Sequence, residues 1–131
     1  MKGLDTPPRH VIDVLHRAGV RESDLIAVVA GDLDASARFG EAWVALTAQD
    51  LLVVRGAQLP AKRTGDKPAW HAEGVERIPL TDVEEVTAEH LVGNGFLVAT
   101  IRGEARRLCQ FTNTRARAFG IFSRIAEKVR K

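Results

Sequence analysis

The side chains best suited to bind a metal ion or to act as a nucleophile are four histidines and one cysteine. His10, His16, His71 and His90 are dispersed along the chain, and no His-x-x-x-His pair occurs. Zinc sites need three or four clustered ligands, so this spacing predicts ordinary surface histidines and no metal site. Cys109 has no histidine beside it in the sequence, and we expect it to be a small buried side chain rather than a nucleophile.

Carboxylates gather in one acidic run, which contains Asp82, Glu84, Glu85 and Glu89. Two carboxylates on one face could act as a general acid and base, but in a strand only alternate side chains share a face. Charged side chains on a strand are most often solvated. The chain also has no Gly-x-x-x-x-Gly-Lys-Ser/Thr loop for phosphate. We therefore predict a non-catalytic protein that uses no cofactor.

Positive charge is concentrated toward the C-terminus. The chain of 131 residues has a net charge of +2, which divides into −5 over residues 1–100 and +7 over residues 101–131. The basic end predicts contact with anionic lipid, a segment that precedes a membrane helix, or a solvated helix face. The candidate contacts with an anionic surface are Lys62, Arg63, Lys67, Arg115, Arg117, Arg124, Lys128 and Arg130.

Other partners and compartments are disfavoured by composition. Aromatic residues make up 5% of the chain and tyrosine is absent, which is poor material for stacking on nucleic-acid bases. No apolar run approaches the ~20 residues of a membrane helix, and the N-terminal residues lack the apolar core of a secretory signal. A single cysteine excludes an internal disulfide. We expect a cytoplasmic protein, with the inner face of the membrane as the alternative location.

The elements that must position these residues are predicted from apolar spacing. Two prolines precede Val11, Ile12 and Leu15, and Gly19 follows them, which predicts a short N-terminal helix. Asn94-Gly95 and the Arg102-Gly103-Glu104 segment are typical of hairpin turns. Residues 56–72 contain two prolines and predict an exposed irregular loop. Short apolar runs predict about seven strands, at 25–30, 42–47, 51–55, 75–80, 83–91, 96–101 and 107–111.

The C-terminal segment predicts an amphipathic helix. Asn113 or Thr114 can cap it, and apolar residues from Phe119 to Val129 fall at helical spacing. A curled antiparallel sheet leaves one end open, and we expect this helix to close that end. The expected core residues are Trp43, Leu46, Val53, Val98, Ile101, Phe111, Phe119 and Phe122.

Three segments of the chain resemble the bacterial pleckstrin-homology-like (PH-like) fold: residues 39–54, residues 78–86 and Phe111-Thr112-Asn113. The resemblance implies a mainly β domain. About seven antiparallel strands would form a bent sheet or partly open barrel, capped by a C-terminal amphipathic helix. The PH-like domain would cover residues 23–131, after an N-terminal helical extension over residues 1–22, in a single globular unit.

A narrower resemblance involves residues 38–41, residues 89–95 and the same Phe111-Thr112-Asn113 segment. Together they are similar to the N-terminal cytosolic domain of some bacterial ABC exporter subunits. This resemblance implies an accessory or regulatory module whose partner is another protein or a membrane domain in the same polypeptide. The alternative is a free-standing PH-like module that binds an anionic membrane surface or a protein partner.

Overall fold

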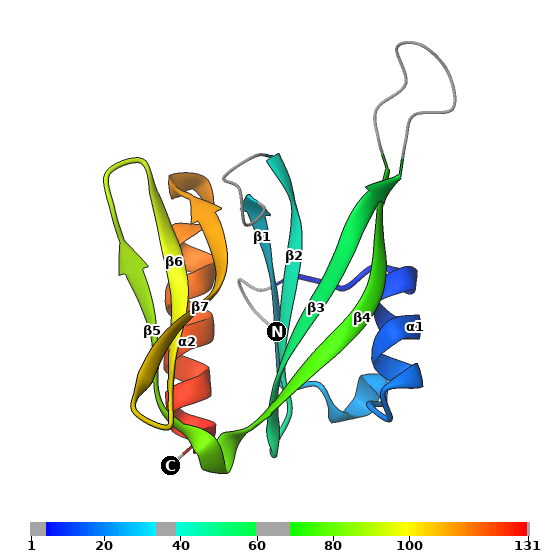
Figure 1. Ribbon diagram of the computed structural model, residues 1–131, viewed down its shortest axis with the longest axis horizontal. Coiled ribbons are helices and arrows are strands. Elements are labelled where there is room, and N and C mark those ends of the chain that lie inside the picture. The colour runs from blue at the N-terminus through cyan, green and yellow to red at the C-terminus, as the bar shows by residue number, and fades with distance from the viewer. Residues whose placement is uncertain (1–4, 34–38, 60–68, 131) are drawn as a thin grey trace.

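The computed structural model describes residues 5–33, 39–59 and 69–130, which Figure 1 shows in ribbon form. Over these residues the chain forms seven strands and two α-helices. The strands are β1 (Ala27–Leu33), β2 (Phe39–Leu46), β3 (Asp50–Leu59), β4 (Ala69–Pro79), β5 (Val83–His90), β6 (Asn94–Ile101) and β7 (Glu104–Thr112). The helices are α1 (Arg9–Arg17) and α2 (Ala116–Arg130), and the short 3-10 turns are η1 (Glu22–Asp24), η2 (Leu80–Asp82) and η3 (Asn113–Arg115).

The strands are all antiparallel, in the order β4-β3-β2-β1-β7-β6-β5. β1 and β7 pair at one position, between Leu33 and Gln110. The molecule is therefore a four-stranded sheet, β1–β4, beside a three-stranded sheet, β5–β7 (Figure 1). Over the described residues, β4 and β5 do not pair with each other, so no closed barrel forms. The mainly β architecture with a C-terminal helix confirms that part of the prediction.

The main core lies between the inner faces of the two sheets and α2. The rings of Phe111 and Phe119 stack 4.3 Å apart at an interplanar angle of 12°. Both rings and Phe122 are fully buried, and Leu46 and Val53 of the four-stranded sheet join them. The apolar stripe of α2 therefore closes the space between the sheets. This packing is favourable because it removes the aromatic rings from water.

A second core lies on the opposite face of the four-stranded sheet, where α1 covers β3 and β4 (Figure 1). Val11 and Leu15 of α1 are buried there together with Leu52. Trp43 is buried as predicted, but in this second core rather than beside Phe119. Alternate side chains of a strand face opposite ways, so β2 supplies Val44 to one core and Trp43 to the other.

The predicted irregular loop over residues 56–72 is strand at its described ends, residues 56–59 and 69–72, and there the prediction is wrong. β3 continues to Leu59 and β4 begins at Ala69, with pairing from Asp50↔Pro79 to Leu59↔Ala69. Polar composition suggested a loop, but the β3–β4 ladder continues through this stretch by backbone pairing, which does not depend on side-chain type. Residues 60–68, and with them Lys62, Arg63 and Lys67, lie outside the described residues.

The β5–β6 hairpin forms as predicted, but its turn precedes the expected Asn94-Gly95 pair. The Leu91 N–H donates to the Asn94 carbonyl at 2.8 Å, and Gly93 has a φ of +83°, which glycine adopts without strain. Gly95 lies inside β6, where a Cβ would come within 2.7 Å of the Phe111 ring. Gly95 therefore serves packing rather than the turn.

Candidate functional site

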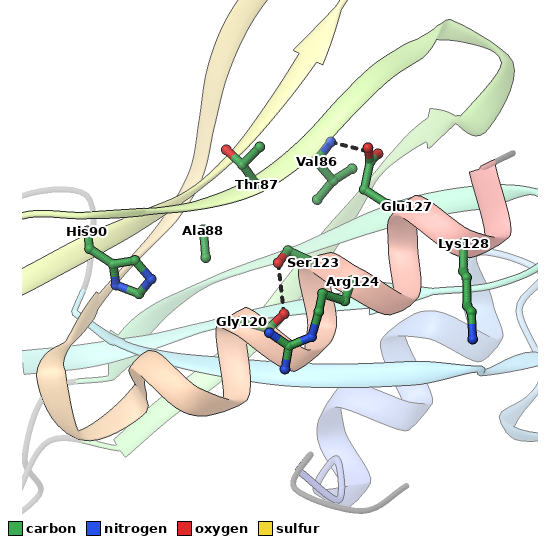
Figure 2. A pocket seen from close by; sticks show the side chains of 9 residues that line it. All are labelled: Val86, Thr87, Ala88, His90, Gly120, Ser123, Arg124, Glu127 and Lys128. Carbon is green, nitrogen blue, oxygen red and sulfur yellow. Dashed lines mark hydrogen bonds between the residues drawn. The ribbon is translucent and has the colours of Figure 1, made fainter.

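A groove of about 440 Å³ runs between β5 and α2 (Figure 2). β5 is the last strand of the sheet order, and α2 crosses beside its outer edge. The strand contributes both side chains and backbone to the groove, and the helix contributes polar and charged side chains. The lining residues are Val86, Thr87, Ala88, His90, Gly120, Ser123, Arg124, Glu127 and Lys128.

The backbone of β5 faces this groove at alternate residues. The Val86 N–H donates to Glu127 Oε2 of α2 at 3.1 Å, so it points away from β6. In an antiparallel ladder, the N–H and C=O of every second residue face the same edge. Ala88 and His90 therefore direct their backbone groups outward as well. Among the described residues, no strand pairs with this edge, which leaves it able to accept one more strand.

Glu127 is fixed in place by Arg130. Arg130 donates through Nε to Glu127 Oε2 at 2.7 Å and through its terminal nitrogen to Oε1 at 3.1 Å. The hydrogen bond to Glu127 raises the pKa of Arg130 above its usual value. The carboxylate therefore holds the Val86 N–H at one end of the groove, where α2 approaches β5 (Figure 2).

The predicted cations of the C-terminal segment divide into two groups. Arg115 hydrogen-bonds and ion-pairs with Asp5 and donates through Nε to the Ala30 carbonyl at 3.2 Å. Arg130 pairs with Glu127. The other three, Arg117, Arg124 and Lys128, are exposed, and within the described part of the chain none of them pairs with a carboxylate.

The groove contains a serine, a histidine and a glutamate, the residue types of a nucleophilic triad. In the described structure, however, each of these side chains contacts a residue outside such a triad. Ser123 Oγ donates to the Gly120 carbonyl at 2.9 Å, while Glu127 binds Arg130 and the Val86 N–H. The His90 ring lies edge-on to Phe111, with centroids 6.0 Å apart. Figure 2 shows His90 toward the opposite end of the groove from Glu127. This arrangement suits binding better than acyl transfer.

Sequence reasoning identified Arg124 and Lys128 but missed the strand edge and Glu127. The edge is defined by which strand has a neighbour, and the order along the chain does not reveal that β5 ends the sheet. A signal for Glu127 did exist, because it is the one acidic residue in a basic helical segment, residues 116–130. An isolated carboxylate of this kind indicates an intramolecular partner.

Comparison of the chain with protein-family models, curated proteins and solved structures finds no match in any of the three. The described residues contain no cluster of three or more His, Cys, Asp or Glu side chains suited to hold a metal ion. No α-helix in the described part of the chain has the length and apolar character needed to cross a membrane.

Proposed function

We propose that this chain is a non-catalytic, PH-like interaction domain that binds an extended, acidic segment of a protein partner along β5. The outward-facing edge of β5, open inside a groove beside α2, is the observation that carries the proposal. The antiparallel strands and the helix that follows the last of them are the features that support a PH-like description. The relation to an ABC-type exporter rests on the sequence resemblance alone.

The backbone edge supplies affinity that does not depend on the partner's sequence. An added strand hydrogen-bonds to outward N–H and C=O groups, and the Ala88 and His90 backbones face that way. Val86 and Ala88 also pack against the main core, so the edge is held on a rigid base. Alternate side chains of the added segment would then point toward α2.

The charge of the groove favours an acidic partner. Arg124 and Lys128 stand on α2 along the groove (Figure 2), whereas the charge of Glu127 is balanced by Arg130. Carboxylates of an incoming segment would come within a Debye length, about 8 Å, of these two cations, neither of which pairs with a carboxylate among the described residues. Such pairs contribute chiefly to selectivity and association rate.

The test uses a blocked hexapeptide of alternating valine and glutamate, titrated into the ¹⁵N-labelled protein and followed by NMR. We expect shifts at Val86, Ala88, His90 and the groove side of α2. Replacement of Ala88 by proline removes an outward N–H and leaves the β6 pairing in place, so it should abolish these shifts. Arg124→Glu should weaken binding about tenfold, and Arg17→Glu on the distant α1 is the matched charge control.

Two results would contradict the proposal. One is shifts that avoid β5. The other is equal binding by the wild type and the Ala88→Pro variant, provided the variant's spectrum away from β5 is unchanged. A lysine-for-glutamate version of the hexapeptide that binds as tightly as the acidic one would contradict the charge preference while leaving strand addition standing.

A second candidate function is attachment to an anionic membrane surface. The observation favouring it is the exposed stripe of Arg117, Arg124 and Lys128 on α2, at about 1 kcal/mol per well-placed cation. Vesicles of phosphatidylserine and phosphatidylcholine should then sediment the protein at low salt, and pure phosphatidylcholine should not. A triple glutamine variant of the stripe should stay in the supernatant, while Ala88→Pro should sediment like the wild type. Equal sedimentation by both vesicle types would refute this function.

A further inference from the structure

A second hollow, of about 270 Å³, lies where the three-stranded sheet meets the β2–β3 part of the four-stranded sheet. It shares no lining residue with the β5–α2 groove. It adjoins the place where the two sheets pair through the single contact of Leu33 with Gln110. The residues around it are Ala42, Arg55, Phe96, Arg107, Leu108, Cys109 and Gln110.

Gln110 is the uncharged polar residue that lines this hollow, and its side-chain amide is available to bind a ligand. Its exposed fraction is 8%, and the hydrogen bonds of the described residues include none to its side-chain amide. No described side-chain nitrogen or oxygen is fully buried without a partner, so the amide reaches the open space of the hollow. A nearly buried amide in such a position offers a donor and an acceptor to a bound molecule.

Two arginines, Arg55 and Arg107, line the same hollow, and Arg55 belongs to an ion-pair cluster beside it. Arg106 hydrogen-bonds Glu76 through two nitrogens, and Arg55 approaches the same carboxylate at 3.4 Å. The hydrogen bond from Arg106 lowers the pKa of Glu76, which keeps this carboxylate ionised. Arg107 lies over the Phe96 ring, 4.0 Å from its centroid. Glu76 thus pairs with Arg106 and Arg55. Arg107 forms no ion pair with a carboxylate in the described part of the chain, so the lining of the hollow has an excess of positive charge.

The remaining lining is apolar. Leu108 is buried in the main core, and Ala42 packs against it. The Phe96 ring is held under the Arg107 guanidinium. A molecule in the hollow would therefore meet cations and an amide on one side and aliphatic and aromatic carbon on the other. The volume is just below the usual range for ligand pockets, which limits the apolar part to about the size of one ring.

We propose that this hollow binds a small carboxylate with a short apolar body. The carboxylate oxygens would accept hydrogen bonds from the Arg107 guanidinium and the Gln110 amide, with Arg55 adding a second cation. The apolar body would pack against Phe96 and Ala42. This site goes beyond the proposed peptide function, because it uses other residues and another class of ligand.

Phenylacetate and its neutral analogue phenylacetamide are the probes for this site. Titrated into the ¹⁵N-labelled protein, phenylacetate should shift the amide signals of Phe96, Arg107 and Gln110. Phenylacetamide should bind at least about tenfold more weakly, because it lacks the charge that the arginines recognise. The Arg107→Gln variant should bind phenylacetate more weakly by a similar factor. The Arg124→Gln variant, a matched change in the β5–α2 groove, should bind phenylacetate like the wild type.

Gln110→Leu provides a second variant that keeps the volume and removes the amide, and we expect weaker phenylacetate binding with an otherwise unchanged spectrum. The proposal is overturned if phenylacetate shifts none of the three signals, if phenylacetamide binds equally well, or if Arg107→Gln leaves the affinity unchanged. Because the hexapeptide test uses different residues, either proposal can fail while the other stands.

Discussion

Glu76 shows how one side chain connects strands that are distant in the sequence. It lies on β4, opposite Val53 in the ladder, and therefore points to the inner face of the four-stranded sheet. From there it binds Arg106 of β7 and Arg55 of β3. The Arg106 hydrogen bond is the largest cause of its lowered pKa. The carboxylate is thus an ionic link between the two sheets.

The link makes a defined contribution to pH-dependent stability. The folded-state pKa of Glu76 lies below its ordinary 4.5, so its contribution is fully present above that value and is lost as the pH falls through the folded value. Since about a third of the side chain is exposed, we expect Glu76→Gln to cost about 1 kcal/mol or less at neutral pH.

Urea unfolding of both proteins near neutral pH and at about pH 3 measures this effect. The difference in unfolding free energy should shrink in acid, whereas Glu22→Gln, an exposed control on η1, should show no difference at either pH. If the difference in unfolding free energy between the wild type and Glu76→Gln grew larger in acid, it would contradict the lowered pKa of Glu76.

Residue properties that depend on one position were predictable, and those that depend on a partner were not. Cys109 is buried, as its surroundings in the sequence suggested. Arg115 was identified as a cation, but its partner Asp5 is 110 positions away. No local pattern indicates that pairing, and the contribution of Arg115 to surface binding stays a prediction.

At the scale of elements, helices and edges differ in how well a sequence predicts them. The stripe from Phe119 onward predicted α2 because helical spacing is visible in the residues themselves. β5 was predicted nearly to its ends, yet its position at the edge was not, because the strand order depends on pairing between distant segments. The candidate groove could therefore not be found from the sequence.

On three strands whose edges are open, a side chain from outside the sheets accepts one backbone N–H bond. The Val86 N–H of β5 binds Glu127, the Ala72 N–H of β4 donates to His10 Nδ1 at 3.3 Å, and the Ala30 N–H of β1 donates to Asp5 at 2.8 Å. Exposed edges invite pairing with other chains. Each of these acceptors blocks one point of attachment, and the span from Ala88 to His90 is left open.

The packing of α2 gives a prediction for an element. Phe119 is fully buried and stacks on Phe111, so Phe119→Ala should lower the unfolding free energy by about 3 to 5 kcal/mol. Ile121, half-buried on the same helix, is the matched control, and Ile121→Ala should cost clearly less. Urea denaturation measures both values. Equal losses for the two variants would show that α2 does not close the core through the Phe119 face.

For the whole molecule, Asp5 and Arg115 join the N-terminal segment, β1 and the start of α2. The Asp5 N–H donates to the Val28 carbonyl at 3.1 Å, its carboxylate accepts from the Ala30 N–H, and Arg115 completes the cluster. These bonds lie along the edge of β1 that β7 meets only at Leu33. The cluster thus replaces part of a missing strand ladder.

A double-mutant cycle tests this cluster. Asp5→Ala and Arg115→Ala should each destabilise the protein, and the two changes together should cost less than their sum by about 1 kcal/mol or more. Arg117→Ala, exposed on the same helix, should combine additively with Asp5→Ala. Full additivity of the Asp5 and Arg115 changes, measured by urea unfolding, would mean that the two side chains act independently.

The division into two sheets also follows the order of synthesis. α1 and the four-stranded sheet come from residues 9–79, and the three-stranded sheet and α2 come from residues 83–130, with η2 between them. A ribosome therefore delivers the four-stranded half first. Until Phe111, Phe119 and Phe122 emerge, the inner face of that half, with Val44 and Val53, stays uncovered. The nascent chain passes through an interval in which a chaperone, or a second nascent chain, can reach a surface that the finished protein hides.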